Sequence, residues 1–209
     1  MSVRTVVLTA CLLLAGAAHA QTLPRPAEFY FDADASATQR LAATDKTGDA
    51  AVQELLDRIG RNARDVAATA QLAHLAMAGG REDLGQELYR RALAQLDAND
   101  RNYRPVLWGY GWDLYRADDP AGALEQWTTL VASKGLSSTW MPHTLALALW
   151  SVGREEEAVQ WYAAAVRSEP QQWRTTTGYP SLLADWTPAE RERLAEVQAA
   201  WAANPPRYP

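Results

Sequence analysis

The sequence is poor in cysteine, lysine and phenylalanine. Its only cysteine is Cys11, and its 209 residues include two lysines and two phenylalanines. One thiol cannot form an internal disulfide, and cysteine-based zinc sites need several thiolates. A formal net charge of −5 argues against nucleic acid as a partner, because nucleic-acid binding uses basic patches. We therefore expect a fold that its apolar core holds together.

Short catalytic motifs are also missing. The sequence has no G-x-S-x-G, H-E-x-x-H, P-loop or G-x-G-x-x-G segment. After the first 20 residues only two histidines remain, His74 and His143, which are too few for a structural zinc site. We expect no enzymatic activity, no cofactor and no metal. A converging pair of carboxylates for glycoside hydrolysis stays open, although nothing singles out a pair.

The first 20 residues are typical of a secretory signal peptide. Arg4 gives a positive start, an apolar run extends from Val6 to Ala15, and Ala18-His19-Ala20 is a small-x-small cleavage site. We expect cleavage after Ala20, export to the periplasm or the medium, and no stable membrane insertion afterwards. Cleavage also removes Cys11. The alternative is a lipoprotein in which Cys11 carries the lipid.

The rest of the chain is expected to be mainly helical. Residues 21–47 begin with prolines and lack a long apolar period, so we expect an extended arm that becomes helical near Ala35. Residues 48–65 are expected to form an N-terminal capping helix. Residues 66–172 carry apolar side chains at helical spacing, and no β pattern of any length is present. The predicted fold class is all-α.

The C-terminal part, residues 173–209, is expected to hold a linker, a capping helix and a tail. Thr187 is a good N-cap, Pro188 suits the first helical position, and Glu190 completes a capping box. We expect this helix to cover the end of the repeats.

Three segments within residues 66–172 share one spacing of small and large side chains. A small residue is followed four positions later by a ring and three positions after that by another apolar residue. The segments are offset by 38 and 35 residues. The small side chain lets two helices approach closely, and the ring fills the space beside the crossing. With Gly111 from a first helix, the predicted repeat-packing residues are Gly85, Tyr89, Ala92, Gly111, Ala123, Trp127, Ala158, Tyr162 and Ala165.

This pattern resembles the tetratricopeptide repeat, a helix–turn–helix unit of about 34 residues. The three copies span about 66–99, 104–137 and 139–172. The third copy matches best, with Gly153 at its turn, whereas Asp118 replaces that glycine in the second copy. The resemblance implies an α-solenoid of about three helical hairpins with helical caps.

All nine tryptophans lie between residues 108 and 201. In the tetratricopeptide family, the first helix of each repeat lines a concave groove. The resemblance therefore assigns eight residues to a ligand groove: His74, Trp108, Trp112, Tyr115, Trp140, His143, Leu147 and Trp150. The family's carboxylate clamp is absent, since the two lysines fall outside the groove.

Two interpretations of this aromatic stripe stay open. The stripe is core if the Phe29-Tyr30-Phe31 arm or the proline-rich tail, residues 205–209, covers it. It is otherwise an open aromatic groove for an extended peptide, for which a proline-rich ligand is suitable.

The sequence predicts a non-enzymatic protein–protein interaction module of the periplasm or envelope, with an unidentified protein or peptide as its partner. The alternative is a cell-wall glycan-binding protein that uses tryptophan platforms.

Overall fold

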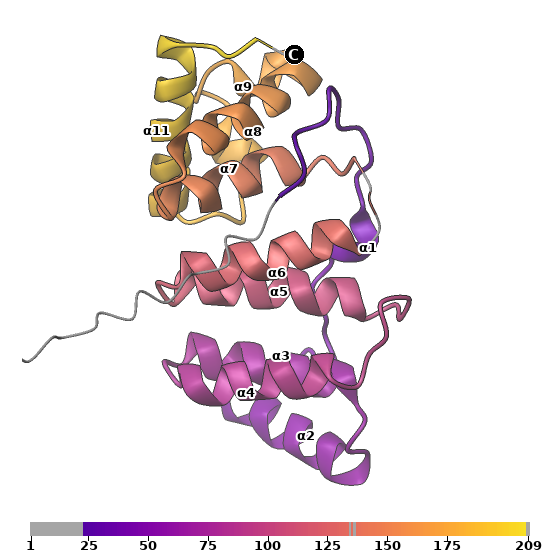
Figure 1. Ribbon diagram of the computed structural model, residues 1–209. Coiled ribbons are helices and arrows are strands. Elements are labelled where there is room, and N and C mark those ends of the chain that lie inside the picture. Colours follow the sequence, from indigo (N-terminus) through magenta and orange to yellow (C-terminus); the bar gives the residue numbers. More distant parts are fainter. Residues whose placement is uncertain (1–22, 134, 136, 208–209) are drawn as a thin grey trace, which may run out of the picture.

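The computed structural model describes residues 23–133, 135 and 137–207 (Figure 1). The predicted signal peptide and its cleavage site lie outside the described residues. The helices are α1 (Ala35–Thr38), α2 (Gly48–Arg61), α3 (Val66–Ala78), α4 (Glu82–Leu93), α5 (Tyr103–Arg116), α6 (Pro120–Ala132), α7 (Met141–Ser151), α8 (Glu155–Ser168), α9 (Pro170–Trp173), α10 (Tyr179–Leu182) and α11 (Pro188–Ala203).

The all-α prediction is confirmed. Within the described ranges, the only non-helical pairing is an isolated parallel bridge between Asp32 and Ser138. The predicted short helix near Ala35 is α1, and the predicted N-terminal capping helix is α2. None of the helices in this part of the chain combines the length and the hydropathy that crossing a membrane requires.

Helices α3–α8 form three successive pairs that are stacked in Figure 1, with α2 beyond the first pair and α11 beside the last. Each pair turns at a residue with positive φ: Gly80 at 71°, Asp118 at 63° and Gly153 at 77°. Asp is one of the few non-glycine residues that tolerate this left-handed conformation. The turn therefore recurs at the same position in all three pairs, even where the glycine is missing.

Small residues let the paired helices approach closely, as their pattern predicts. A Cβ on Gly111 would lie 2.3 Å from Nε1 of Trp127, and a Cβ on Gly85 would lie 2.5 Å from Cγ of Met77. Trp127 is fully buried. All nine predicted repeat-packing residues are buried.

Helix α11 covers one end of the stack by packing on α7 and α8. Its capping box is present: the Thr187 hydroxyl accepts from the Glu190 backbone N–H at 3.2 Å, and the Glu190 carboxylate accepts from the Thr187 N–H at 2.7 Å. Two short helices that the sequence pattern did not predict precede it: α9, at the end of the third predicted copy, and α10, in the linker.

The N-terminal arm crosses from the last helix pair to the middle one. Tyr30 is buried, and its ring lies 5.9 Å from that of Trp161 in α8. Asp34 pairs with Arg104 of α5 and accepts from the Trp140 indole at 3.0 Å. Of the proposed aromatic cover, only Tyr30 is buried, since Phe29 and Phe31 are 52% and 81% exposed.

Candidate functional site

A cavity of about 920 Å³ lies along the first helices of the three pairs. Residues of α3 and α5 and the beginning of α7 form its base. Two segments outside the three helix pairs also line it: residues 38–42 of the arm, and residues 181–186, which run from the end of α10 into the loop before α11. The second segment belongs to residues 173–203, called the cap below, so segments that precede and follow the helix pairs in the sequence both line the cavity.

Four tryptophans line this cavity: Trp108, Trp112, Trp140 and Trp186. Their rings meet edge to face, with centroids 5.1 Å apart for Trp108 and Trp140, and 5.0 Å apart for Trp112 and Trp186. Such arrangements are favourable for aromatic quadrupoles and hold each ring in one orientation. The rings therefore form a rigid apolar wall before any ligand arrives.

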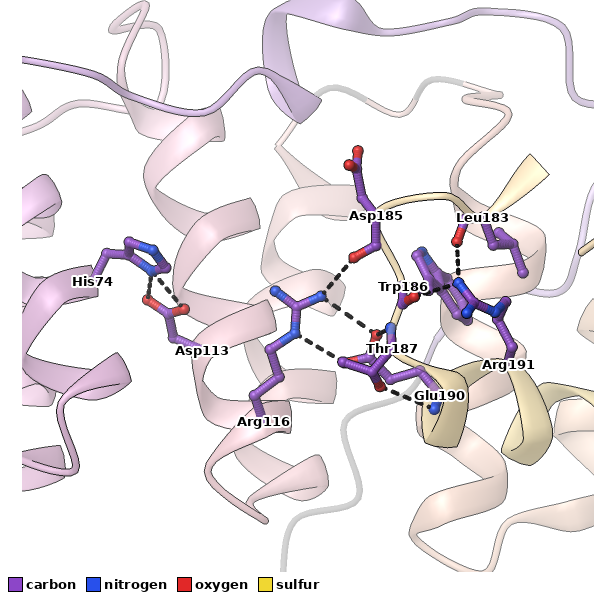
Figure 2. Close-up of polar contacts among 9 residues, drawn as sticks. All are labelled: His74, Asp113, Arg116, Leu183, Asp185, Trp186, Thr187, Glu190 and Arg191. Atoms are coloured by element: carbon purple, nitrogen blue, oxygen red, sulfur yellow. Dashed lines mark hydrogen bonds and ion pairs between the residues drawn. The ribbon is translucent and has the colours of Figure 1, made fainter. Parts of the chain in front are cut away.

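A hydrogen-bonded group of polar residues lies at the α3–α5 end of the cavity. Nδ1 of His74 lies 2.9 and 3.0 Å from the two carboxylate oxygens of Asp113 (Figure 2). The Tyr89 hydroxyl donates to the same carboxylate at 2.6 Å. Burial, and then the Asp113 charge, raise the pKa of Tyr89 well above its ordinary value, so its hydroxyl stays a donor. Tyr89 is thus both a repeat-packing residue and part of the site.

Arg116 connects the middle helix pair to the cap. Its Nε donates to the buried Glu190 carboxylate at 2.9 Å, and its Nη2 donates to the Asp185 carbonyl at 3.1 Å (Figure 2). Its guanidinium also lies 5.1 Å from the Trp112 ring centroid, in cation–π range. Arg191 donates to the carbonyls of Leu183 and Trp186. These contacts fix residues 181–186 against the cavity.

His143 lines the opposite end of the cavity, on α7. Its ring stacks on that of Trp173 with centroids 4.6 Å apart, and the centroid of the Trp186 ring lies 5.7 Å from that of His143. Nδ1 is fully buried and has no hydrogen-bond partner in the described chain. Burial lowers the pKa of His143 to about 3, so the imidazole is neutral at physiological pH.

Five of the eight predicted groove residues line the cavity: His74, Trp108, Trp112, Trp140 and His143. The other three lie elsewhere. Tyr115 hydrogen-bonds Ser151 at 2.9 Å, Leu147 is fully buried, and the Trp150 indole donates to Glu196 of α11 at 2.8 Å. The cap helix packs on α7, so the third copy does not present an open groove along its whole length.

Several lining residues were not predicted from the sequence. Arg40 comes from the arm, Asp113 and Arg116 from α5, and Trp186 from the linker. Trp186 had one local signal, because it directly precedes the N-cap Thr187, where an apolar residue often packs against its own helix. Arg40 and Asp113 had none, since they reach the cavity only through tertiary packing.

Comparison with known proteins identifies no relative: no protein-family model, curated protein or solved structure matches the chain. Within the described residues, no group of three or more His, Cys, Asp or Glu side chains is placed to hold a metal ion. The arrangement offers flat aromatic surfaces and fixed hydrogen-bonding groups, which are features of a binding site.

Proposed function

We propose that the protein is an exported α-solenoid of three tetratricopeptide-like repeats that binds a peptide segment of a partner protein in its tryptophan-lined cavity, without catalysing a reaction. The repeat part of this proposal is supported by the left-handed turns at residues 80, 118 and 153, which have the same offsets as the small residues 85, 123 and 158. Repeated hairpins of this kind stack to give one extended inner surface.

The observation that carries the binding role is the cavity itself. Its volume of about 920 Å³ is near the upper end of the usual range for ligand pockets, about 300–1,000 Å³. Trp108, the half-buried member of the four tryptophans, supplies an aromatic contact surface at a small cost in side-chain entropy, and the three buried rings support it. Ring–ring contacts and the bonds of Arg116 hold the walls in place, so binding loses little conformational freedom.

A peptide-display selection against the full chain tests this role. We expect the enriched peptides to bind the parent and to lose at least tenfold in affinity on Trp108→Ala, because Trp108 is a half-buried cavity residue. Trp150→Ala is the matched control, since Trp150 is also half-buried but contacts α11. Equal affinity for the parent and Trp108→Ala would contradict binding in the cavity.

The second candidate is a soluble fragment of cell-wall glycan. The half-buried Trp108 ring and the polar residues His74 and Asp113 line the same cavity, and a sugar can bind with one face on an aromatic ring and its hydroxyls on such polar groups. Titration with muropeptides in the same variants separates the two candidates. Binding of muropeptides that Trp108→Ala abolishes, together with no enriched peptide, would favour the glycan.

Export is tested separately by cell fractionation and N-terminal sequencing. We expect a periplasmic or secreted protein that begins at Gln21. A protein that keeps Met1 in the cytoplasm would contradict export, and a membrane-bound form that Cys11→Ser releases would identify a lipoprotein.

A further inference from the structure

We infer that the cavity takes a proline-rich segment in the polyproline II conformation. This inference rests on the proposed function and names the class of peptide. It follows from a comparison of two sets of hydrogen-bonding groups around the cavity: those that already have a partner within the described chain, and those that have none.

The unused groups are mainly donors. The indole N–H groups of Trp108, Trp112 and Trp186 have no hydrogen-bond partner in the described part of the chain, and none of them is fully buried. The Trp140 indole, in contrast, donates to Asp34. Arg40, on the arm side of the cavity, makes no hydrogen bond or ion pair with any described residue.

Two side-chain acceptors at the α3–α5 end of the cavity are already occupied. The Asp113 carboxylate accepts from Tyr89 and lies against Nδ1 of His74. The amide oxygen of Gln71 accepts from the backbone N–H groups of Ala43 and Thr44, at 2.6 and 2.9 Å. The unpaired indole and guanidinium donors therefore favour a ligand that brings acceptors.

Glu190, beside the cavity, and Asp185, which lines it, are two further acceptors. The Glu190 carboxylate is bound by Arg116 and by the Thr187 N–H. The Asp185 side chain is exposed, and Figure 2 shows its carboxylate turned away from Arg116. Asp185 thus offers an anion at the rim, where a basic residue flanking the bound segment would be accommodated.

A proline-rich segment has this hydrogen-bonding character. Proline has no backbone N–H, and a polyproline II helix makes no internal hydrogen bonds, so its carbonyls are free to accept. Its rings are apolar and pack on aromatic side chains, and its stiffness lowers the entropy lost on binding. An extended ordinary peptide brings backbone N–H groups and a sugar brings hydroxyl donors, both of which need acceptors.

The test uses the full chain labelled with ¹⁵N-tryptophan and a proline decamer as the probe. Single Trp→Phe variants assign each indole N–H signal. We expect the decamer to shift the signals of Trp108, Trp112 and Trp186 and to leave that of Trp150 in place. Trp108→Phe keeps an aromatic ring but removes the donor, so we expect the decamer to bind roughly fivefold more weakly. Trp150→Phe is the control and should bind like the parent.

Three other outcomes would overturn the inference. If a display-selected peptide without proline shifts the cavity signals and the decamer does not, the inference fails and the proposed function stands. If only muropeptides shift them, the ligand is a glycan. If the decamer binds equally well to the parent and Trp108→Phe, the indole donor has no role, and the argument from unused donors fails.

Discussion

The two ends of the cavity differ in how their buried polar side chains are accommodated. At the α3–α5 end, polar groups satisfy one another, because His74 and Tyr89 share the Asp113 carboxylate. At the α7 end, His143 lies between the rings of Trp173 and Trp186, and its buried nitrogen has no partner within the described residues. The same residue type is thus hydrogen-bonded at one end and enclosed by rings at the other.

This difference comes from what covers each end. The cap lies over α7, where α11 and residues 181–186 bring aromatic and apolar side chains. The arm lies over the α3 end, where the His74 side chain keeps 31% of its surface exposed. The covering segments, more than the helix pairs themselves, decide the chemistry at each end.

We expect the largest effect on stability from removing the Trp186 ring, which residues 181–186 place in the cavity wall. Trp186→Ala deletes a side chain that is 9% exposed and packs on Trp112 and His143, so we expect a loss of about 3 kcal/mol in unfolding free energy. Urea denaturation measures it. Leu182→Ala, at a 38% exposed position beside it, is the control and should cost less than about 1 kcal/mol. Equal losses would mean that the cap does not depend on Trp186.

The next effect concerns the link between the middle helix pair and the cap. Arg116→Gln leaves the Glu190 carboxylate, whose side chain is 5% exposed, without its cation. Since Arg116 itself is about one-third exposed, we expect a loss of about 2 kcal/mol, less than for a fully buried pair. Hydrogen exchange should speed up in residues 181–186 and remain unchanged in α3. Uniform exchange throughout the chain would contradict this role.

The next contrast is a slope, because pH distinguishes the two ends. His143 has a folded-state pKa of about 3, below the ordinary value of 6.5, so the unfolded chain binds more protons between these values. Stability should therefore fall as pH drops from 6.5 towards 3, by at most about 1.4 kcal/mol per pH unit from this group. His143→Phe should reduce that slope. An unchanged slope in the variant would show that His143 is not held neutral by burial.

The smallest effect is expected at the polar end. Asp113→Asn keeps the shape of the side chain but replaces a charged acceptor with a neutral one, so we expect a loss of about 1 kcal/mol. The Trp186 indole signal should not move, because the change lies at the other end. A loss as large as that of Trp186→Ala would remove the contrast between the two ends.

Local features of the fold could be predicted from the sequence. Thr187 and Glu190 form the predicted capping box, and Asp118 replaces a turn glycine because both residues adopt positive φ. Steric rules of this kind act over a few residues, so a single sequence reveals them. The spacing also placed small residues where helices approach closely, as Gly111 does against Trp127.

The cavity was only partly predictable. The repeat register indicates which face of a first helix points inward, and it places His74 and Trp108 at the site. It does not indicate what covers that face, so Leu147, predicted in the groove, is fully buried in the core. The Arg116–Glu190 contact joins residues 74 positions apart, and no local pattern indicates such a contact.

Site-specific photocrosslinking in living cells tests the central claim most directly. A benzophenone amino acid replaces either Leu182, which lines the cavity, or Leu84, a similarly exposed leucine on α4. We predict a discrete crosslinked product from position 182 that disappears when Trp108→Ala is added, and no such product from position 84. The same product from position 84, or one from position 182 that survives Trp108→Ala, would contradict partner binding in this cavity.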